Sequence, residues 1–199
     1  MGHGAARAAR YTNGGVTVPK PTPSQTVGPF FARDLLWKDG GVVLFSGRRD
    51  RITLTGRLFD GDGAPIYDAL FETWQADPTG AFPSGHDGAR PYGYGRVSTD
   101  TDGRYAIETV VPGSFKGPGG ETYAPQISVA IFARGLLKAV QTRVFLAPLE
   151  MVKDDPLARA LGDPDRLRTL IATRDAKDPK IYRWDVRLRG AGETVFITI

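Results

Sequence analysis

The segment RITLTGRL, from Arg51 to Leu58, decides the fold because apolar and polar residues alternate along it without a break. Its apolar face holds Ile52, Leu54, Gly56 and Leu58, while arginines and threonines occupy the other face. A period of two is typical of a β-strand with one buried side. The glycines and proline of residues 61–65 then predict a turn.

Further strands of the same kind follow along most of the chain. The expected strands are residues 69–74, 96–99, 104–110, 127–131, 138–146, 182–188 and 194–199. Asp102-Gly103, between the second and third of these, predicts a β-hairpin. Residues 84–95 and 113–120 are rich in Gly, Pro and Asp and predict loops. Many short strands separated by Gly/Pro turns predict an all-β fold, an antiparallel β-sandwich.

Helical signals appear only near residues 155–174. Asp155-Pro156 and Asp163-Pro164 each place a capping carboxylate before a proline suited to the first helical position. Leu167, Leu170 and Ile171 supply an apolar stripe. The sequence therefore predicts short helices in this region of an otherwise β domain.

The first 33 residues differ from the rest in charge. They hold Arg7, Arg10, Lys20 and Arg33 and no acidic residue, which accounts for the whole formal net charge of +4. The prolines and glycine of residues 19–29 favour extended backbone. We expect an extended basic arm over residues 1–33 and a β-sandwich domain over residues 34–199. The arm either lies along an acidic partner or, for residues 1–15, is a solvated end.

Composition excludes several classes of function. The chain has 199 residues, 41% of them hydrophobic, which is enough for one core. It has no cysteine, which rules out disulfides and thiolate sites and fits a cytoplasmic location, and it has no apolar run long enough to cross a bilayer. The balanced charge after residue 33 argues against nucleic acid. With His3 and His86 as its two histidines, the chain cannot build a multi-histidine metal site.

A series of short motifs carries a family signal over residues 22–199. In chain order they are TPSQTVGPF (22–30), ETWQAD (72–77), GRVSTD (95–100), DGRY (102–105), PG (112–113), IFARG (131–135) and YRWDV (182–186). Together they resemble the intradiol ring-cleaving dioxygenases, and among these the iron-free α-type chains of the enzymes that cleave protocatechuate. The resemblance implies an enzyme subunit that is inactive alone. Its complex would open protocatechuate with O₂ in aromatic catabolism, the β-ketoadipate pathway.

The resemblance also implies where iron would be, and that this chain lacks it. In this family two tyrosinates and two histidines hold Fe(III), and hard phenolate oxygens suit that ion. At the matching positions stand Phe115, Gln126 and Ser128, which cannot replace a phenolate and two imidazoles. Tyr92 and Tyr94 are candidates for the second tyrosine only by proximity. We expect no metal and no catalytic residue in this chain, with Fe(III) held by a homologous β subunit in a higher-order assembly.

By the same resemblance, Thr26, Gly28, Pro29 and Arg134 border the substrate pocket beside the partner's iron. Arg134 would hold or screen the anionic substrate. Plainer interpretations exist for most of these: Pro23, Gly28 and Pro29 shape a turn before the sandwich, and Arg134 pairs with a carboxylate at the edge of the core. Trp74 and Trp184 are expected to be core or interface anchors, the aspartates at 77, 100 and 102 turn formers, and Arg96 a structural donor.

Two other functions stay open at this point. One is a non-catalytic sandwich module that lost its iron and binds a ligand or a protein. The other keeps iron in this chain through Tyr92, Tyr94, His86 and an aspartate, and predicts visible tyrosinate-to-iron absorption from the chain alone.

Overall fold

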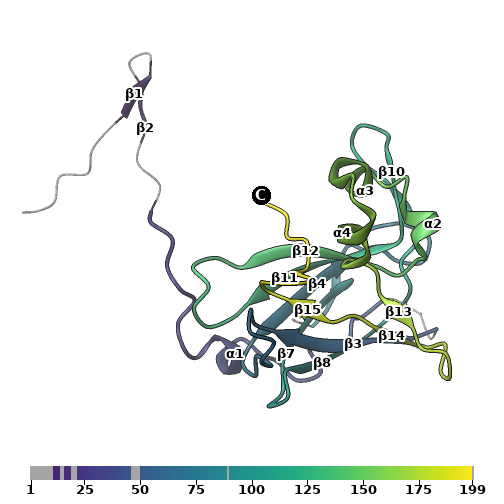
Figure 1. The fold of residues 1–199 in the computed structure, drawn as a ribbon, viewed down its shortest axis with the longest axis horizontal. Helices are drawn as coiled ribbons and strands as arrows, with labels where there is room; N and C mark the ends of the chain where they lie inside the picture. Colours follow the sequence, from purple (N-terminus) through teal and green to yellow (C-terminus); the bar gives the residue numbers. More distant parts are fainter. Residues whose placement is uncertain (1–10, 14–15, 19–21, 46–49, 89, 199) are drawn as a thin grey trace, which may run out of the picture.

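Two β-sheets lie face to face in the computed structural model, which describes residues 11–13, 16–18, 22–45, 50–88 and 90–198 (Figure 1). The first sheet has the antiparallel order β12 (Val140–Phe145), β11 (Gln126–Phe132), β4 (Leu70–Gln75), β7 (Tyr94–Ser98). The second contains β13 (Thr173–Arg174), β14 (Ile181–Arg183), β3 (Ile52–Phe59), β8 (Arg104–Thr109) and β15 (Val186–Arg187). The predicted all-β sandwich is confirmed.

The core between the sheets follows the predicted alternation. In β3, Ile52, Leu54 and Leu58 are buried, and in β11 the buried apolar residues are Ile127, Val129 and Ile131. Phe71 of the first sheet stacks on Tyr105 of the second, with ring centroids 4.3 Å apart. Burial of these apolar faces is the main stabilising term of the fold.

Gly56 belongs to the apolar face of β3 for a steric reason. A Cβ at this position would lie 1.8 Å from the backbone oxygen of Trp184, so only glycine fits. The strand expected over residues 182–188 is interrupted here, as β14 and β15 each pair with β3 and both run parallel to it. Asp185 lies in the gap and accepts a hydrogen bond from the backbone N–H of Arg57 at 2.8 Å.

The hairpin predicted at Asp102-Gly103 is wrong. Strands do flank this turn, but β7 pairs with β4 in the first sheet and β8 pairs with β3 in the second. Asp100 shapes the turn by accepting hydrogen bonds from the backbone N–H groups of Asp102 and Arg104. The turn therefore carries the chain from one sheet to the other.

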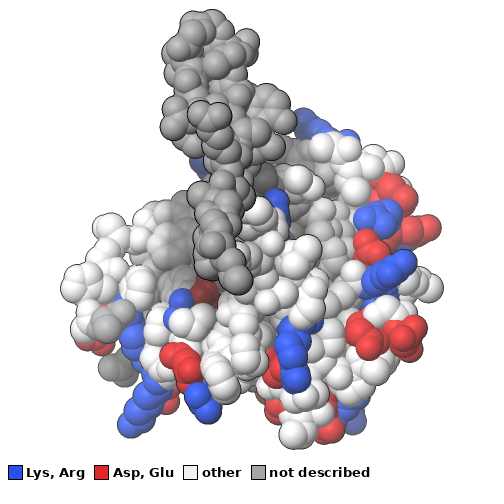
Figure 2. Space-filling view, turned by 90° about the vertical axis from the view of Figure 1, so that its left-hand side faces the viewer, with Lys and Arg blue, Asp and Glu red and all other residues white. Residues whose placement is uncertain are grey.

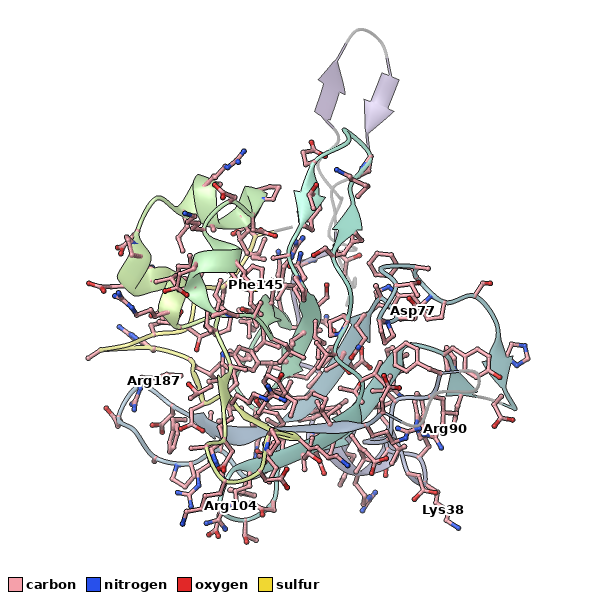
Figure 3. All side chains as sticks on the ribbon, turned by 90° about the vertical axis from the view of Figure 1, so that its right-hand side faces the viewer. Lys38, Asp77, Arg90, Arg104, Phe145 and Arg187 are labelled. Atoms are coloured by element: carbon pink, nitrogen blue, oxygen red, sulfur yellow. The ribbon has the colours of Figure 1, made fainter. Side chains whose placement is uncertain are left out.

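The two predicted Asp-Pro helix starts are confirmed. Helix α3 (Pro156–Leu161) begins after Asp155, whose side chain accepts from the N–H of Leu157, and α4 (Pro164–Arg168) begins after Asp163, whose side chain accepts from Asp165 and Arg166. The sequence did not predict α2 (Leu149–Val152), which precedes them. Leu167 and Leu170 join a second apolar cluster with Phe145 of β12, which fixes the helices against the sandwich (Figure 3).

Both segments expected to be loops contain two-residue strands. Residues 84–95 include β5 (His86–Asp87) and β6 (Arg90–Pro91), and residues 113–120 include β9 (Phe115–Lys116), which pairs with β10 (Thr122–Tyr123). At the C-terminal end, described up to residue 198, the expected strand is reduced to a bridge between Gln141 and Ile197. Such short ladders leave no periodicity in the sequence.

The expected arm is only partly extended. Residues 22–28 have no regular structure, but α1 (Phe31–Asp34) crosses the boundary placed at residue 33, and Phe31 is buried. Strands β1 (Tyr11–Asn13) and β2 (Val16–Val18) pair with each other. Arg7, Arg10 and Lys20 lie outside the described residues, so the division into arm and domain stays a prediction.

The charge distribution and the helices can be compared with the sequence. Lys and Arg are interspersed with Asp and Glu over the face in Figure 2. None of the helices in the described ranges is long and apolar enough to span a membrane.

Candidate functional site

The candidate site lies on the outer face of the first sheet. Since Ile127 and Val129 face the core, Gln126 and Ser128 face outward from β11. The strand register pairs Ser128 with Trp74 of β4 on one side and with Arg143 of β12 on the other. Trp74, Ser128 and Arg143 therefore form a cross-strand row on the face that does not enter the sandwich core.

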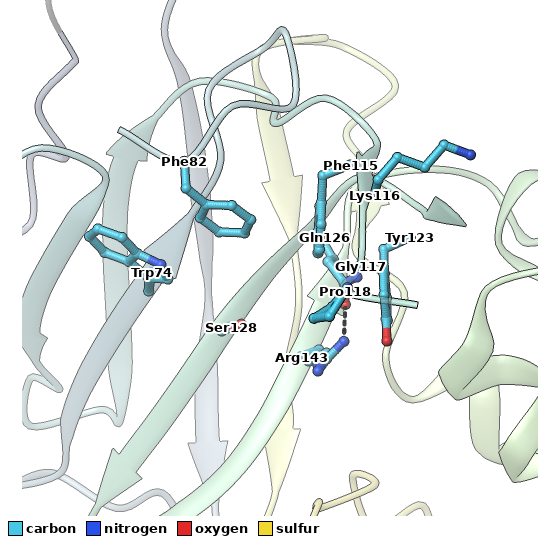
Figure 4. A pocket seen from close by; sticks show the side chains of 10 residues that line it. All are labelled: Trp74, Phe82, Phe115, Lys116, Gly117, Pro118, Tyr123, Gln126, Ser128 and Arg143. Atoms are coloured by element: carbon cyan, nitrogen blue, oxygen red, sulfur yellow. Dashed lines mark hydrogen bonds between the residues drawn. The ribbon is translucent and has the colours of Figure 1, made fainter. Parts of the chain in front are cut away.

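A cavity of about 400 Å³ lies over this row (Figure 4). Its lining residues are Trp74, Phe82, Phe115, Lys116, Gly117, Pro118, Tyr123, Gln126, Ser128 and Arg143. Phe115 and Tyr123 come from the paired strands β9 and β10 and stack with centroids 5.0 Å apart. Phe82 packs edge-on against Phe115, again at 5.0 Å.

The three positions that the resemblance matched to metal ligands meet in this cavity. Phe115, Gln126 and Ser128 come from two segments and all line it. Sequence reasoning missed Arg143 because its place beside Ser128 depends on the register between β11 and β12. Trp74, expected as an anchor in a core or interface, is a 37% exposed wall of the cavity.

The residues present do not fit Fe(III). Phe115 offers no donor atom, and the amide oxygen of Gln126 already accepts a hydrogen bond from the guanidinium of Arg143 at 3.1 Å. Arg143 thus brings a fixed positive charge to the place where the ligands of a trivalent cation would converge. Within the described ranges, no group of three His, Cys, Asp or Glu side chains lies close enough to hold a metal ion.

The hydroxyl of Tyr94 belongs to a polar cluster separate from the cavity. The side chain of Arg96 donates to the Tyr94 hydroxyl at 3.2 Å and to a carboxylate oxygen of Glu72 at 2.6 Å. Burial, followed by the hydrogen bond and charge of Glu72, raises the pKa of Tyr94 to about 12. Because a tyrosine must lose its proton to bind a metal, the raised pKa makes Tyr94 a poorer ligand than an ordinary tyrosine. Arg96 is the structural donor that the sequence predicted.

His86, Trp184 and Asp77 each have different surroundings. His86 is exposed on β5. Trp184 is buried, and its indole N–H donates to the backbone oxygen of Thr169 at 2.9 Å, which confirms its expected core position. Asp77, like Asp100, accepts backbone hydrogen bonds within its own turn, from Thr79 and Ala81.

The four residues expected to border a substrate pocket lie together in a different cavity. Thr26, Gly28, Pro29 and Arg134 line a space of about 180 Å³ with Val27, Ala133 and Gly135. Gly28 has φ +86°, a conformation that favours glycine. Arg134 pairs with Asp68 and donates to the hydroxyl of Tyr67, and these two contacts raise the pKa of its guanidinium. The plainer interpretation of Arg134, pairing with a carboxylate, is confirmed, and its place in a substrate pocket stays a prediction.

The two cavities lie at opposite ends of β11. Gln126 begins the strand and lines the larger cavity, whereas the chain reaches the smaller one at Ala133, just after the strand ends at Phe132. At about 3.3 Å per residue the strand separates them by roughly 20 Å. The residues of the smaller cavity therefore cannot border the larger one.

Comparison with known proteins gives one consistent result. The model of the Dioxygenase family (Dioxygenase_C) matches residues 28–190. The chain is 37% identical over 208 residues to the protocatechuate 3,4-dioxygenase alpha chain of Burkholderia cepacia, covering 92% of this chain and 100% of that one. It is 32% identical to the alpha chain of Pseudomonas putida, with 88% and 94% covered. The solved intradiol ring-cleavage dioxygenase of Tetranychus urticae superposes with TM-score 0.58 at 19% identity, covering 84% of this chain and 94% of that one.

Proposed function

Because the chain belongs to the intradiol dioxygenase family, we propose that it is the iron-free α-type subunit of a protocatechuate 3,4-dioxygenase. In this proposal it completes a substrate pocket at the interface with an iron-carrying β subunit. The complex cleaves protocatechuate with O₂ to 3-carboxy-cis,cis-muconate. The alpha chains of Burkholderia cepacia and Pseudomonas putida, matched over nearly their whole length, support this assignment.

The separation of the two cavities carries the proposal. The positions matched to metal ligands hold Phe115, Gln126 and Ser128 at one end of β11. The residues matched to the pocket wall gather roughly 20 Å away at the other end of the strand. This distance from the chain's own cavity supports the proposal that the wall closes over the active site of another subunit.

Each wall residue has a role suited to its chemistry. Gly28 and Pro29 present backbone with little side-chain bulk, so a planar ring can approach closely. Arg134 presents a guanidinium whose side chain is 55% exposed and which its contact with Asp68 holds in place. In the complex this guanidinium binds or screens the carboxylate of the substrate.

The surface around the smaller cavity is suited to a permanent partner. Val27, Phe30 and Leu137 are 40%, 58% and 59% exposed, although all three are large apolar side chains. Val27 and Leu137 also line an adjoining hollow of about 250 Å³. Apolar groups clustered beside a charged anchor are typical of an interface core. We place the β subunit on this surface and, since the chain has no cysteine, the complex in the cytoplasm.

The test is expression of the chain with and without a homologous β chain. Alone, the chain should be colourless, free of stoichiometric iron and inactive. Co-expressed, the two should purify as one red-brown complex that consumes O₂ with protocatechuate. Tightly bound iron in the isolated chain, or turnover without a companion chain, would contradict the proposal. A co-purified complex without dioxygenase activity would favour the non-catalytic binding module instead.

A further inference from the structure

We propose that the larger cavity, over the row Trp74–Ser128–Arg143, is a metal-free binding site for a small aromatic carboxylate. The proposal concerns this chain's own cavity, so it does not depend on the catalytic assignment made above. Three independent features of the cavity lead to it: its aromatic lining, its unbalanced charge and an unsatisfied amide.

The lining is suited to a single aromatic ring. Trp74, Phe82, Phe115 and Tyr123 all border the space, and its volume of about 400 Å³ falls within the range of small-molecule sites. Trp74 and Phe82 lie nearly parallel, at 14° with centroids 6.2 Å apart. Their faces and the stacked pair Phe115–Tyr123 offer stacking and edge contacts to a planar ligand.

The charge of the lining is suited to an anion. Arg143 and Lys116 border the cavity, although the Lys116 side chain points away from it (Figure 4), and no Asp or Glu is among the lining residues. Within the described ranges, neither cation has a carboxylate within ion-pair distance: Arg143 donates to Gln126 and lies over the ring of Tyr123, and Lys116 donates to Thr122. A guanidinium without an anionic partner beside an aromatic cavity is a natural site for a carboxylate.

Gln126 adds a donor that has no acceptor. Its side chain is 3% exposed, and its amide Nε2 has no hydrogen-bond partner. The orientation of the amide is fixed, because its oxygen accepts from Arg143. A buried unpaired donor is unfavourable, and a ligand oxygen reaching it would remove that cost. A carboxylate can accept from Nε2 and from the guanidinium through two oxygens and neutralise the cation, whereas a neutral amide offers one uncharged oxygen and a bare ring offers none.

The test is calorimetric titration of the full chain with 4-hydroxybenzoate. We expect one molecule bound per chain. 4-Hydroxycyclohexanecarboxylate, which lacks the aromatic ring, and 4-hydroxybenzamide, which lacks the charge, should each bind at least tenfold more weakly. No binding of 4-hydroxybenzoate would overturn the proposal, and equal binding of either analogue would overturn the assigned ligand class.

Variants locate the site. Gln126→Glu keeps the shape of the side chain and its contact with Arg143 but turns the unpaired donor into a negative group, so it should weaken binding at least tenfold. Arg143→Gln should do the same by removing the cation. Arg159→Gln, an exposed substitution outside the cavity, should bind like the parent chain. Unchanged binding in both cavity variants, with folding checked by circular dichroism, would place the ligand elsewhere and overturn the proposal.

Discussion

Two aspartates that cap neighbouring helices should differ about threefold in their contribution to stability. Asp155 and Asp163 each precede a proline and each accept a hydrogen bond from the first turn of their helix. Asp155, however, is 1% exposed, and its second oxygen accepts from the backbone N–H of Ala124 at 2.9 Å. Asp163 is exposed and its bonds stay within its own helix.

The magnitudes follow from these contacts. Replacing either aspartate by alanine removes its helix cap, one hydrogen bond for Asp155 and two for Asp163, at a cost of about 1 kcal/mol per cap. Asp155→Ala also leaves the buried N–H of Ala124 without an acceptor, which costs about 2 kcal/mol more. For a chain of this size, 1 kcal/mol lowers the melting temperature by about 3 °C. We therefore expect a fall of about 9 °C for Asp155→Ala and about 3 °C for Asp163→Ala.

Thermal unfolding followed by circular dichroism, on matched samples of the two variants and the parent, measures the difference. Asp155→Asn serves as a further control, since its side-chain oxygen can still accept a hydrogen bond and part of the loss should be recovered. Because Ala124 follows Tyr123, a cavity residue, Asp155→Ala should also weaken 4-hydroxybenzoate binding. Equal melting temperatures for the two alanine variants would refute the reasoning that the Asp155–Ala124 bond ties the helices to the cavity.

Three further results are expected. In the co-expressed complex, Arg134→Gln should lower kcat/KM for protocatechuate at least tenfold, which steady-state O₂ uptake measures, while Arg159→Gln should leave it unchanged; equal values would remove Arg134 from the pocket. Tyr105→Phe should lower the free energy of unfolding in urea by about 1–2 kcal/mol, because the buried Tyr105 hydroxyl donates to the backbone oxygen of Trp184 at 2.6 Å. Since the pKa of Tyr94 is raised to about 12, its protonated phenol stabilises the fold below pH 10, and this contribution is lost as pH rises towards 12. Tyr94→Phe should remove that part of the pH dependence of urea unfolding, and an unchanged profile would contradict the raised pKa.

Local chemistry made part of this fold predictable. The alternation in β3 reports burial directly, because successive side chains point to opposite faces. The Asp-Pro pairs predicted two helices because the capping bond and the fixed φ of proline act within three residues. Helix α2 carries no such signal: it follows Pro148, which makes no side-chain capping bond, and spans Leu149–Val152.

The prediction of a hairpin at Asp102-Gly103 failed because turn residues determine only that the chain reverses. They do not determine which strand each flanking strand pairs with. The backbone N–H of Thr99, just after β7, donates to the oxygen of Ala69, just before β4 of the first sheet. The backbone oxygen of Gly103 accepts from Leu58 of β3 in the second sheet. The partners lie 30 and 45 residues away in the sequence. Only the packing of the two sheets selects them over the local alternative.

At the candidate site, too, the sequence alone reveals only part of the result. Two features distinguish this site from an iron centre. The sequence reveals the first, the missing donors at Phe115, Gln126 and Ser128. The second is Arg143, whose guanidinium lies 3.1 Å from the amide oxygen of Gln126 and is placed there by strand register alone. Restoring histidines at 126 and 128 and tyrosine at 115 would therefore set three donors beside a fixed cation. Coulomb repulsion between that cation and Fe(III) would oppose metal binding, so recovery of iron requires a change at Arg143 as well.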